Sequence, residues 1–305
     1  MGDVGLKKFL DEAMIELSDV YASNNYWTKT RRSAGFVADT PNENESKLGR
    51  GIGRLTHIDD SYRLDAIESI FQRDSSPDPA ELTSEQVAIA NMVFLTLFSP
   101  SPSQFESLEE AMDLFWSTAH IRNELLEVLK ILRTRVAKKH VAVFESGEIP
   151  LRLHATYGRS EVLAAFGVST VDKPLSFREG VYFHKNTKTD LFFVTMDKSN
   201  DTFSQSTRYR DFAISESEFH WESQAGTRIV SETGQRYINQ ASGETNVMLF
   251  VRESTRFSNG QTRPFVCAGL ADYLRHEGER PIAITWRLRN PLPGALFSSL
   301  RAAIA

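Results

Sequence analysis

The side chains best suited to chemistry on a nucleic acid lie in residues 177–227. A carboxylate there can accept a hydrogen bond from the exocyclic amine of cytosine, and an aromatic face can lie against a base turned out of its stack. Arginine and lysine suit the phosphates of the same strand, and hydroxyl groups can add neutral phosphate contacts. The candidate base-pocket residues are Asp197, Asp211, Tyr209, Trp221 and Tyr182, and the candidate nucleic-acid contacts are Arg178, Lys198, Arg208, Arg210, Ser206 and Thr207.

A structural interpretation competes with this one. Large aromatic residues such as Trp221 often fill the core of a sheet, and Asp211 can equally be the ion-pair partner of an arginine. The same residue types therefore fit a reading pocket and an ordinary half-buried sheet.

A third interpretation is a Mg²⁺-dependent nuclease built from Glu179, Asp190, Asp197 and Lys198. Carboxylates hold the ion in such enzymes, and a lysine stabilises negative charge. Asp197 and Lys198 are adjacent, however, so the usual acidic-x-Lys step after a strand is missing.

Other catalytic motifs are absent from the sequence. It has no G-x-x-x-x-G-K-[ST] phosphate loop, no H-E-x-x-H, no G-x-S-x-G and no His-x-Lys pair of the phospholipase-D type. Cys267 is the only cysteine, which excludes an intramolecular disulfide and a zinc site built on paired cysteines. We therefore expect no catalytic residue, metal or cofactor in this chain.

The first half of the sequence has helical patterns. Helices are predicted over 5–23, 26–36, 46–56, 62–73, 107–118 and 119–139, and another from a capping box at Thr83 and Gln86 through Phe98. The cluster Asp59-Asp60-Ser61 is a good N-cap for the helix over 62–73.

The pattern changes after Glu145. Residues 151–157 alternate like a strand, and Ser160 is expected to cap a short helix. Further strands are predicted near 181–184, 190–196, 219–223, 247–252, 265–270 and 281–288, with a closing helix at LFSSLRAA. The fold class expected is α+β, with a helical domain over 1–145 and a mainly antiparallel curled sheet or barrel over 146–305.

The charge differs between these two halves. Residues 1–145 hold 16 Lys and Arg against 23 Asp and Glu, whereas residues 146–305 hold 19 against 17. The second half is therefore compatible with nucleic-acid contact, although the whole chain carries a formal charge of −5. No apolar run is long enough to span a membrane and no secretion signal begins the chain, so a cytoplasmic location is expected.

Six blocks, which occur in order, resemble one family. They are LFFVTMDKS, TRYRDFAIS, FHWESQ, TGQRYINQ, MLFVRE and ITWRLRNPLP. Together they resemble the C-terminal domain of unknown function that follows a phospholipase-D-type nuclease and a DEAD/DEAH-type helicase in bacterial proteins. NYWTKTRRSAGF and RLTHIDDSYRL in the first half resemble the helical connector before that domain. Met1 comes shortly before this pattern, which indicates a shortened chain or a split gene.

The resemblance implies a function as well as a fold. Some of those bacterial proteins resemble ATP-dependent type IV restriction enzymes, which defend the cell by cleaving DNA that carries modified cytosine. The implied role is a non-catalytic module that binds double-stranded DNA with 5-methyl-type cytosine for a helicase-nuclease domain or subunit. By analogy of fold class alone, the sheet would resemble the PUA and SET-and-RING-associated readers. The alternative is an interaction or regulatory module of a helicase that contacts only protein.

Overall fold

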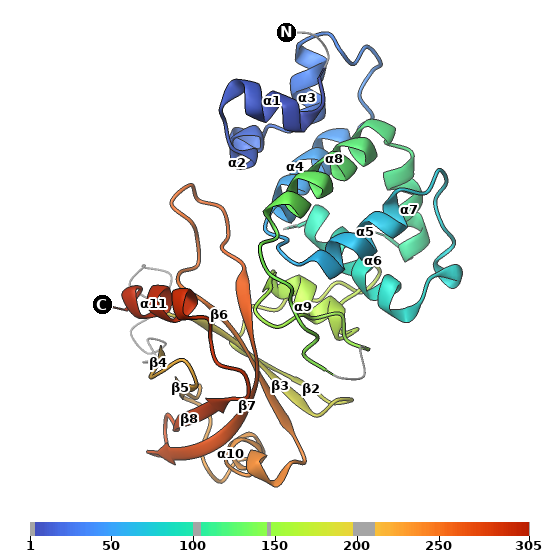
Figure 1. Cartoon of the computed structure of the whole chain (residues 1–305). Coiled ribbons are helices and arrows are strands. Elements are labelled where there is room, and N and C mark those ends of the chain that lie inside the picture. The colour runs from blue at the N-terminus through green and yellow to red at the C-terminus, as the bar shows by residue number, and fades with distance from the viewer. Residues whose placement is uncertain (1–3, 100–104, 145–147, 198–210, 305) are drawn as a thin grey trace. The chain divides into compact units, whose positions relative to one another are not determined.

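The computed structural model describes residues 4–99, 105–144, 148–197 and 211–304. These residues form two compact units, Met1–Phe177 and Arg178–Ala305 (Figure 1). The first unit is helical and the second contains an open mixed sheet, so the expected α+β class with helices first and strands second is confirmed. Residues 151–177, which the sequence analysis grouped with the strands, belong to the first unit.

The first unit is built mainly from α-helices. They are α1 Leu6–Ala13, α2 Leu17–Val20, α3 Trp27–Ser33, α4 Glu45–Ile52, α5 Ser61–Phe71, α6 Ser84–Leu97, α7 Leu108–Trp116, α8 Ala119–Arg135 and α9 Arg159–Ala165. Short 3₁₀ turns lie at Ala22–Asn24, Gly53–Leu55 and Pro79–Glu81. No helix of the described residues is long and apolar enough to cross a membrane.

Two predicted helix caps are confirmed. The Asp60 carboxylate accepts a hydrogen bond from the Arg63 backbone N–H at the start of α5. Thr83 and Gln86 form the reciprocal capping box of α6, each side chain bonding to the other's backbone N–H. These caps satisfy N–H groups that a helix cannot pair internally.

Three local predictions for this unit were wrong. The helix predicted over 5–23 is broken at Met14, which takes a left-handed conformation with φ of 52° and ends α1. α9 begins at Arg159 after Gly158, so Ser160 lies inside the helix; the Glu161 carboxylate instead accepts the Gly158 N–H at 2.5 Å. Only Thr156–Tyr157 of the expected strand 151–157 is a strand, β1.

The second unit is organised around one sheet with the strand order β2-β3-β6-β7-β8-β5-β4. Its strands are β2 Val181–His184, β3 Thr189–Thr195, β4 Phe212–Ala213, β5 Glu218–Glu222, β6 Asn246–Arg252, β7 Phe265–Glu277 and β8 Ala283–Leu288. Most pairs are antiparallel, but β3 and β6 are parallel, with Thr189 opposite Asn246 and Thr195 opposite Arg252. The sheet is not closed, so the barrel alternative was wrong.

One apolar cluster fills the core of the second unit. Phe192 of β3 stacks on Trp221 of β5 with 4.1 Å between ring centroids, and Trp286 of β8 meets Phe192 edge-on. Trp286 and Phe192 are fully buried, and Trp221 is nearly so. Such ring pairs stabilise a core beyond their buried area.

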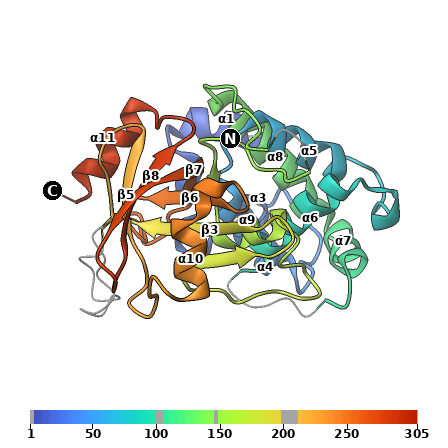
Figure 2. The ribbon, with the colours of Figure 1, turned by 90° about the horizontal axis from the view of Figure 1, so that it is seen from below.

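Among the residues described for this unit are two α-helices, α10 Glu232–Ile238 and α11 Gly294–Ala302, and a 3₁₀ turn at Gln240–Ser242. Figure 2 shows α10 beside the sheet, and Tyr237 of α10 meets both Phe192 and Trp221 edge-on. The close approach of residue 228 to the start of α10 requires glycine at position 234. A Cβ at Gly234 would lie 2.0 Å from the Arg228 carbonyl oxygen. The predicted C-terminal helix corresponds to α11, whereas α10 was not predicted.

Candidate functional site

Six of the predicted nucleic-acid and pocket residues lie outside the described residues. They are Lys198, Ser206, Thr207, Arg208, Tyr209 and Arg210, in the connection between β3 and β4. The remaining phosphate candidate, Arg178, is exposed just before β2. The predictions for these residues therefore stay predictions.

The two candidate acceptors flank that connection. Asp197 follows β3, and its backbone N–H donates to the Glu253 carbonyl at 2.7 Å. Asp211 precedes β4 and is only 7% exposed, and its Oδ1 accepts the Glu222 backbone N–H at 2.9 Å. β3 and β4 are not neighbours in the strand order, so strand pairing does not bring Asp197 and Asp211 together.

The two described aromatic candidates lie in different surroundings. Trp221 is 5% exposed and packs between Phe192 and Tyr237, which places its ring in the core cluster. Tyr182 is partly exposed on β2 at the edge of the sheet, opposite Leu191. Of these two rings, Tyr182 has the more exposed position.

The carboxylates of the nuclease alternative are also separated by their contacts. Asp190 is fully buried, and its two carboxylate oxygens accept hydrogen bonds from Nε and Nη2 of Arg236 at 2.7 and 2.9 Å. Burial raises the pKa of Asp190 despite the opposing effect of Arg236. Glu179 is exposed. Within the part of the chain that the structure describes, no group of three or more His, Cys, Asp or Glu side chains could hold a metal ion.

Arg236 has an aromatic partner too. Its guanidinium lies 3.9 Å from the ring centroid of Phe183 on β2, so it bridges α10, β3 and β2. Such a bidentate, stacked arginine holds a defined position, which lysine cannot reproduce. We assign this cluster to positioning α10 on the sheet.

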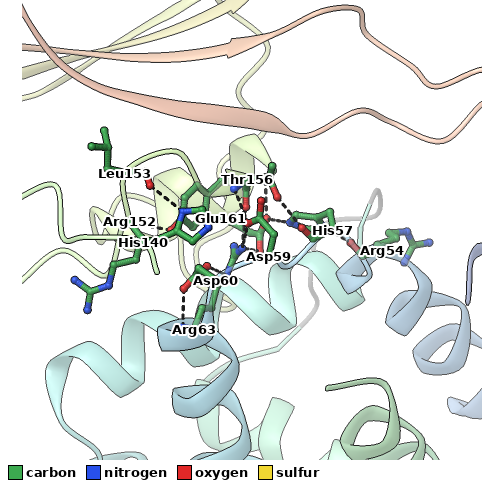
Figure 3. Close-up of polar contacts among 12 residues, drawn as sticks. Arg54, His57, Asp59, Asp60, Arg63, His140, Arg152, Leu153, Thr156 and Glu161 are labelled. Atoms are coloured by element: carbon green, nitrogen blue, oxygen red, sulfur yellow. Dashed lines mark hydrogen bonds and ion pairs between the residues drawn. The ribbon is translucent and has the colours of Figure 1, made fainter. Parts of the chain in front are cut away.

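A buried polar network belongs to the first unit (Figure 3). Its centre is Glu161 of α9, which lies 3.2 Å from Nη1 of Arg63 and 2.7 Å from Nε2 of His57. Arg63 also lies 3.1 Å from the Asp60 carboxylate and donates to the Thr156 carbonyl at 2.8 Å. Its guanidinium sits 4.3 Å from the ring centroid of Tyr157.

Hydrogen bonds to the turn before α5 complete this network. The Thr156 hydroxyl donates to the His57 carbonyl at 2.6 Å, and the Thr156 N–H donates to Asp59 at 2.9 Å. Turn 57–60 and residues 156–161 are therefore joined through side chains on both segments. Nearly a hundred residues separate them in the chain.

The electrostatics of the network favour its charged form. Burial alone would raise the pKa of Glu161, but the charges of His57 and Arg63 and the hydrogen bonds lower it overall. The pKa of Arg63 is raised because Asp60 and Glu161 outweigh its complete burial. With Glu161 and Arg63 each 1% exposed, the arrangement suits holding two segments together better than acting on a substrate.

Sequence reasoning gave Asp59 and Asp60 only a helix-capping role and the other residues of the network none, although one signal pointed to some of them. His57, Asp59, Asp60 and Arg63 all lie in the block RLTHIDDSYRL. Glu161 had no such signal, since its partners lie about a hundred positions earlier.

Cys267 of β7 is fully buried, and burial raises the pKa of its thiol to about 12. A thiol that is protonated at neutral pH is a poor nucleophile. Cys267 therefore acts as a small apolar residue of the sheet.

Comparison with known proteins identifies part of the chain. Residues 151–300 match the family described as Domain of unknown function (DUF3427). No curated protein matches the sequence. The match takes in β1 and α9 of the first unit and most of the second, including all six blocks quoted above. Residues 151–300 are thus a DUF3427 domain.

Proposed function

We propose that the DUF3427 domain is a non-catalytic DNA-binding module that recognises modified, 5-methyl-type cytosine in double-stranded DNA. In this proposal it serves a restriction helicase-nuclease, as a domain or a subunit, in bacterial phage defence. The cell compartment is the cytoplasm, where such DNA would enter.

The observation that carries the proposal is the placement of the six blocks. LFFVTMDKS overlaps β3, FHWESQ overlaps β5, MLFVRE overlaps β6 and ITWRLRNPLP overlaps β8, while TGQRYINQ covers all of α10 except its first residue. TRYRDFAIS contains β4. The resemblance therefore follows one structural unit, as expected for a shared domain.

The charge of the two units supports a division of roles. Residues 178–305 hold 16 Lys and Arg against 14 Asp and Glu, whereas residues 1–177 hold 19 against 26. A surface with excess negative charge repels DNA and suits a protein partner. We assign DNA contact to the second unit and the link to a helicase to the first.

Base recognition in this proposal falls to the connection between β3 and β4 and its flanks. A carboxylate at Asp197 or Asp211 would accept from the cytosine amine, and Tyr209 or Tyr182 would provide an aromatic wall. Arg178, Lys198, Arg208 and Arg210, with Ser206 and Thr207, would contact phosphates. Trp221 would support the pocket from the core cluster that it occupies.

The test is an electrophoretic mobility shift with matched duplexes, one plain and one containing 5-methylcytosine, each with and without Mg²⁺. A stronger shift of the modified duplex, independent of Mg²⁺, is expected. No shift of either duplex would contradict the proposal in favour of a protein-interaction module. Degraded DNA in the Mg²⁺ lanes would contradict the assignment of a non-catalytic role.

A further inference from the structure

Residues 253–264 form an arm between β6 and β7. Figure 1 shows these residues, in orange, extending beyond the sheet as two antiparallel segments. The Arg263 N–H donates to the Thr255 carbonyl at 3.0 Å and the Phe257 N–H to the Gln261 carbonyl at 2.9 Å. Arg256 and Thr262 form a β-bridge. We call this segment the β6–β7 arm.

The tip of the β6–β7 arm is held by local hydrogen bonds. Gly260 has φ of +83° and donates its N–H to the Phe257 carbonyl at 2.9 Å. The Asn259 side chain accepts the Gln261 N–H at 3.0 Å. Arg256 Nη1 donates to the Gly260 carbonyl at 2.9 Å. A tip that is already ordered loses little conformational entropy when it binds.

The side chains of the arm have the chemistry of nucleic-acid recognition. From Ser254 to Pro264 the sequence STRFSNGQTRP contains two arginines, two amides and four hydroxyl groups and no carboxylate. Arginine and amide side chains make the bidentate contacts that distinguish guanine and adenine, and hydroxyl groups contact phosphates. Arg256, Ser258, Asn259 and Thr262 are exposed.

The charge of Arg256 distinguishes it from other arginines of this unit. Arg236 faces Asp190, Arg289 faces Asp272 and Arg263 faces Glu253. The Arg256 guanidinium bonds to a neutral carbonyl, and no carboxylate among the described residues lies within ion-pair distance of it. Within the part of the chain that the structure describes, no carboxylate neutralises its positive charge, which is therefore available to a polyanion.

A second feature of the arm is a stacked pair on its other face. The Arg263 guanidinium lies 4.4 Å from the ring centroid of Phe257, which is 37% exposed. In an antiparallel pair, residues directly opposite share a face and alternate along each strand. Arg256 and Thr262 thus project from one face, and Phe257 and Arg263 from the other.

We propose that the β6–β7 arm enters a groove of duplex DNA, with Arg256 as its leading contact. This inference rests on the proposed function and adds to it an element separate from the connection between β3 and β4. The major groove of B-DNA, roughly 12 Å wide, admits a two-stranded β-ribbon. Arg256 and Thr262 would face the bases or one phosphate wall, while Arg263 and Phe257 would lie toward the opposite side.

The experiment compares four full-length proteins, namely wild type, Arg256→Ala, Arg256→Lys and the matched control Arg301→Ala. Arg301 is an exposed arginine on α11 of the same unit, so its replacement removes the same charge away from the arm. Fluorescence anisotropy measures binding to plain and 5-methylcytosine duplexes over a range of salt. Thermal unfolding midpoints equal to that of wild type establish that each variant is folded.

Arg256→Ala is expected to weaken binding to both duplexes about tenfold and to reduce the slope of log K against log salt by roughly one. Arg301→Ala should bind like wild type. Arg256→Lys restores affinity if the contact is a phosphate, and fails to do so if it is a bidentate contact to a base edge. Either result for the lysine variant, together with the loss in Arg256→Ala, supports DNA contact by the arm and identifies whether Arg256 meets a phosphate or a base.

Two outcomes would overturn the inference in distinguishable ways. If wild type binds DNA and Arg256→Ala matches Arg301→Ala, the arm does not contact DNA, while the proposed function stands. If Arg256→Ala alone fails to bind a helicase-nuclease partner while its DNA binding is unchanged, the arm contacts protein and not DNA. If wild type binds neither duplex at any salt concentration, the proposed function itself fails.

Discussion

Arg236 lies bidentate against Asp190 and so ties α10 to β3 across a buried contact. Asp190 is fully buried, while the Arg236 side chain is 12% exposed. Removal of one partner from such a pair leaves a buried charge without compensation. The pair therefore makes the position of α10 depend on a single side chain.

Replacing Arg236 with alanine should lower the free energy of unfolding by about 3 kcal/mol, because Asp190 would stay buried without its partner. Arg236→Lys should recover only part of this loss, since lysine lacks the fork that meets both carboxylate oxygens. Urea denaturation followed by tryptophan fluorescence measures both. The matched control is Arg289→Ala, whose ion pair with Asp272 is 43% exposed on each side. It should cost less than about 1 kcal/mol, and an equal loss in both variants would contradict the role given to Arg236.

Gly234→Ala should destabilise the second unit, although alanine normally favours a helix. The new Cβ would lie 2.0 Å from the Arg228 carbonyl oxygen, and backbone cannot yield as a flexible side chain does. We expect a loss of about 1–3 kcal/mol, typical of overpacking. Gly226→Ala is the control, because nothing lies within 4 Å of its Cβ. Thermal unfolding compares them, and unchanged stability in Gly234→Ala would show that the entry to α10 can shift.

The stability of the first unit should fall in acid partly through Glu161. Its pKa is lower in the folded chain than in the unfolded chain, so the unfolded state binds the proton first as the pH falls. The stabilisation is complete above the unfolded value of about 4.3 and is lost as the pH falls below it toward the folded value. Glu161→Gln should remove this part of the pH dependence, which begins as the pH falls through the unfolded value of about 4.3. The exposed Glu148→Gln should keep it. Urea denaturation at each pH measures the slopes, and identical slopes in wild type and Glu161→Gln would refute the assignment.

Alanine at Arg178, Lys198, Arg208 or Arg210 should weaken binding to plain and modified duplexes by similar factors. A phosphate contact carries no base information, and its loss should reduce the salt slope by roughly one. Lys29→Ala on α3 of the acidic unit is a control that should leave the slope unchanged. Unchanged slopes in all four variants would remove these residues from the interface.

A fragment starting at residue 146 should be trimmed by limited proteolysis to a core beginning near residue 178. In that fragment Glu161 would lose Arg63 and His57, its partners in the first unit. The full chain should protect the same segment, because Glu161 and its neighbours are buried there. Mass spectrometry of the products locates the cuts. Equal resistance of residues 151–177 in fragment and full chain would contradict the boundary at Phe177.

Features that depend on near neighbours could be predicted from the sequence. The Asp60 cap and the Thr83–Gln86 box act over three residues. Apolar runs such as LFFVT predicted the strands that contain them. β4 was not predicted because it has only two residues and is defined by pairing with β5. Its strand character comes from the partner and not from its own composition.

The site was less predictable for a related reason. The Glu161–Arg63 contact joins residues 98 apart, and the Asp190–Arg236 contact joins residues 46 apart. Nothing in the local pattern of either residue indicates its partner. Asp190 was considered as a metal ligand because its position before LFFVT is visible in the sequence, whereas Arg236 opposite it is not.

The parallel pairing of β3 with β6 also affects how the chain is made. Thr189 and Asn246 are 57 positions apart, so β2 and β3 leave the ribosome well before the strand that covers their inner edge exists. Until then the apolar residues of β3 are open to other chains, and non-local pairs of this kind form slowly. β6, β7 and β8 are joined as consecutive antiparallel strands and can pair soon after synthesis. Production of the protein should therefore benefit from chaperones that bind exposed strands.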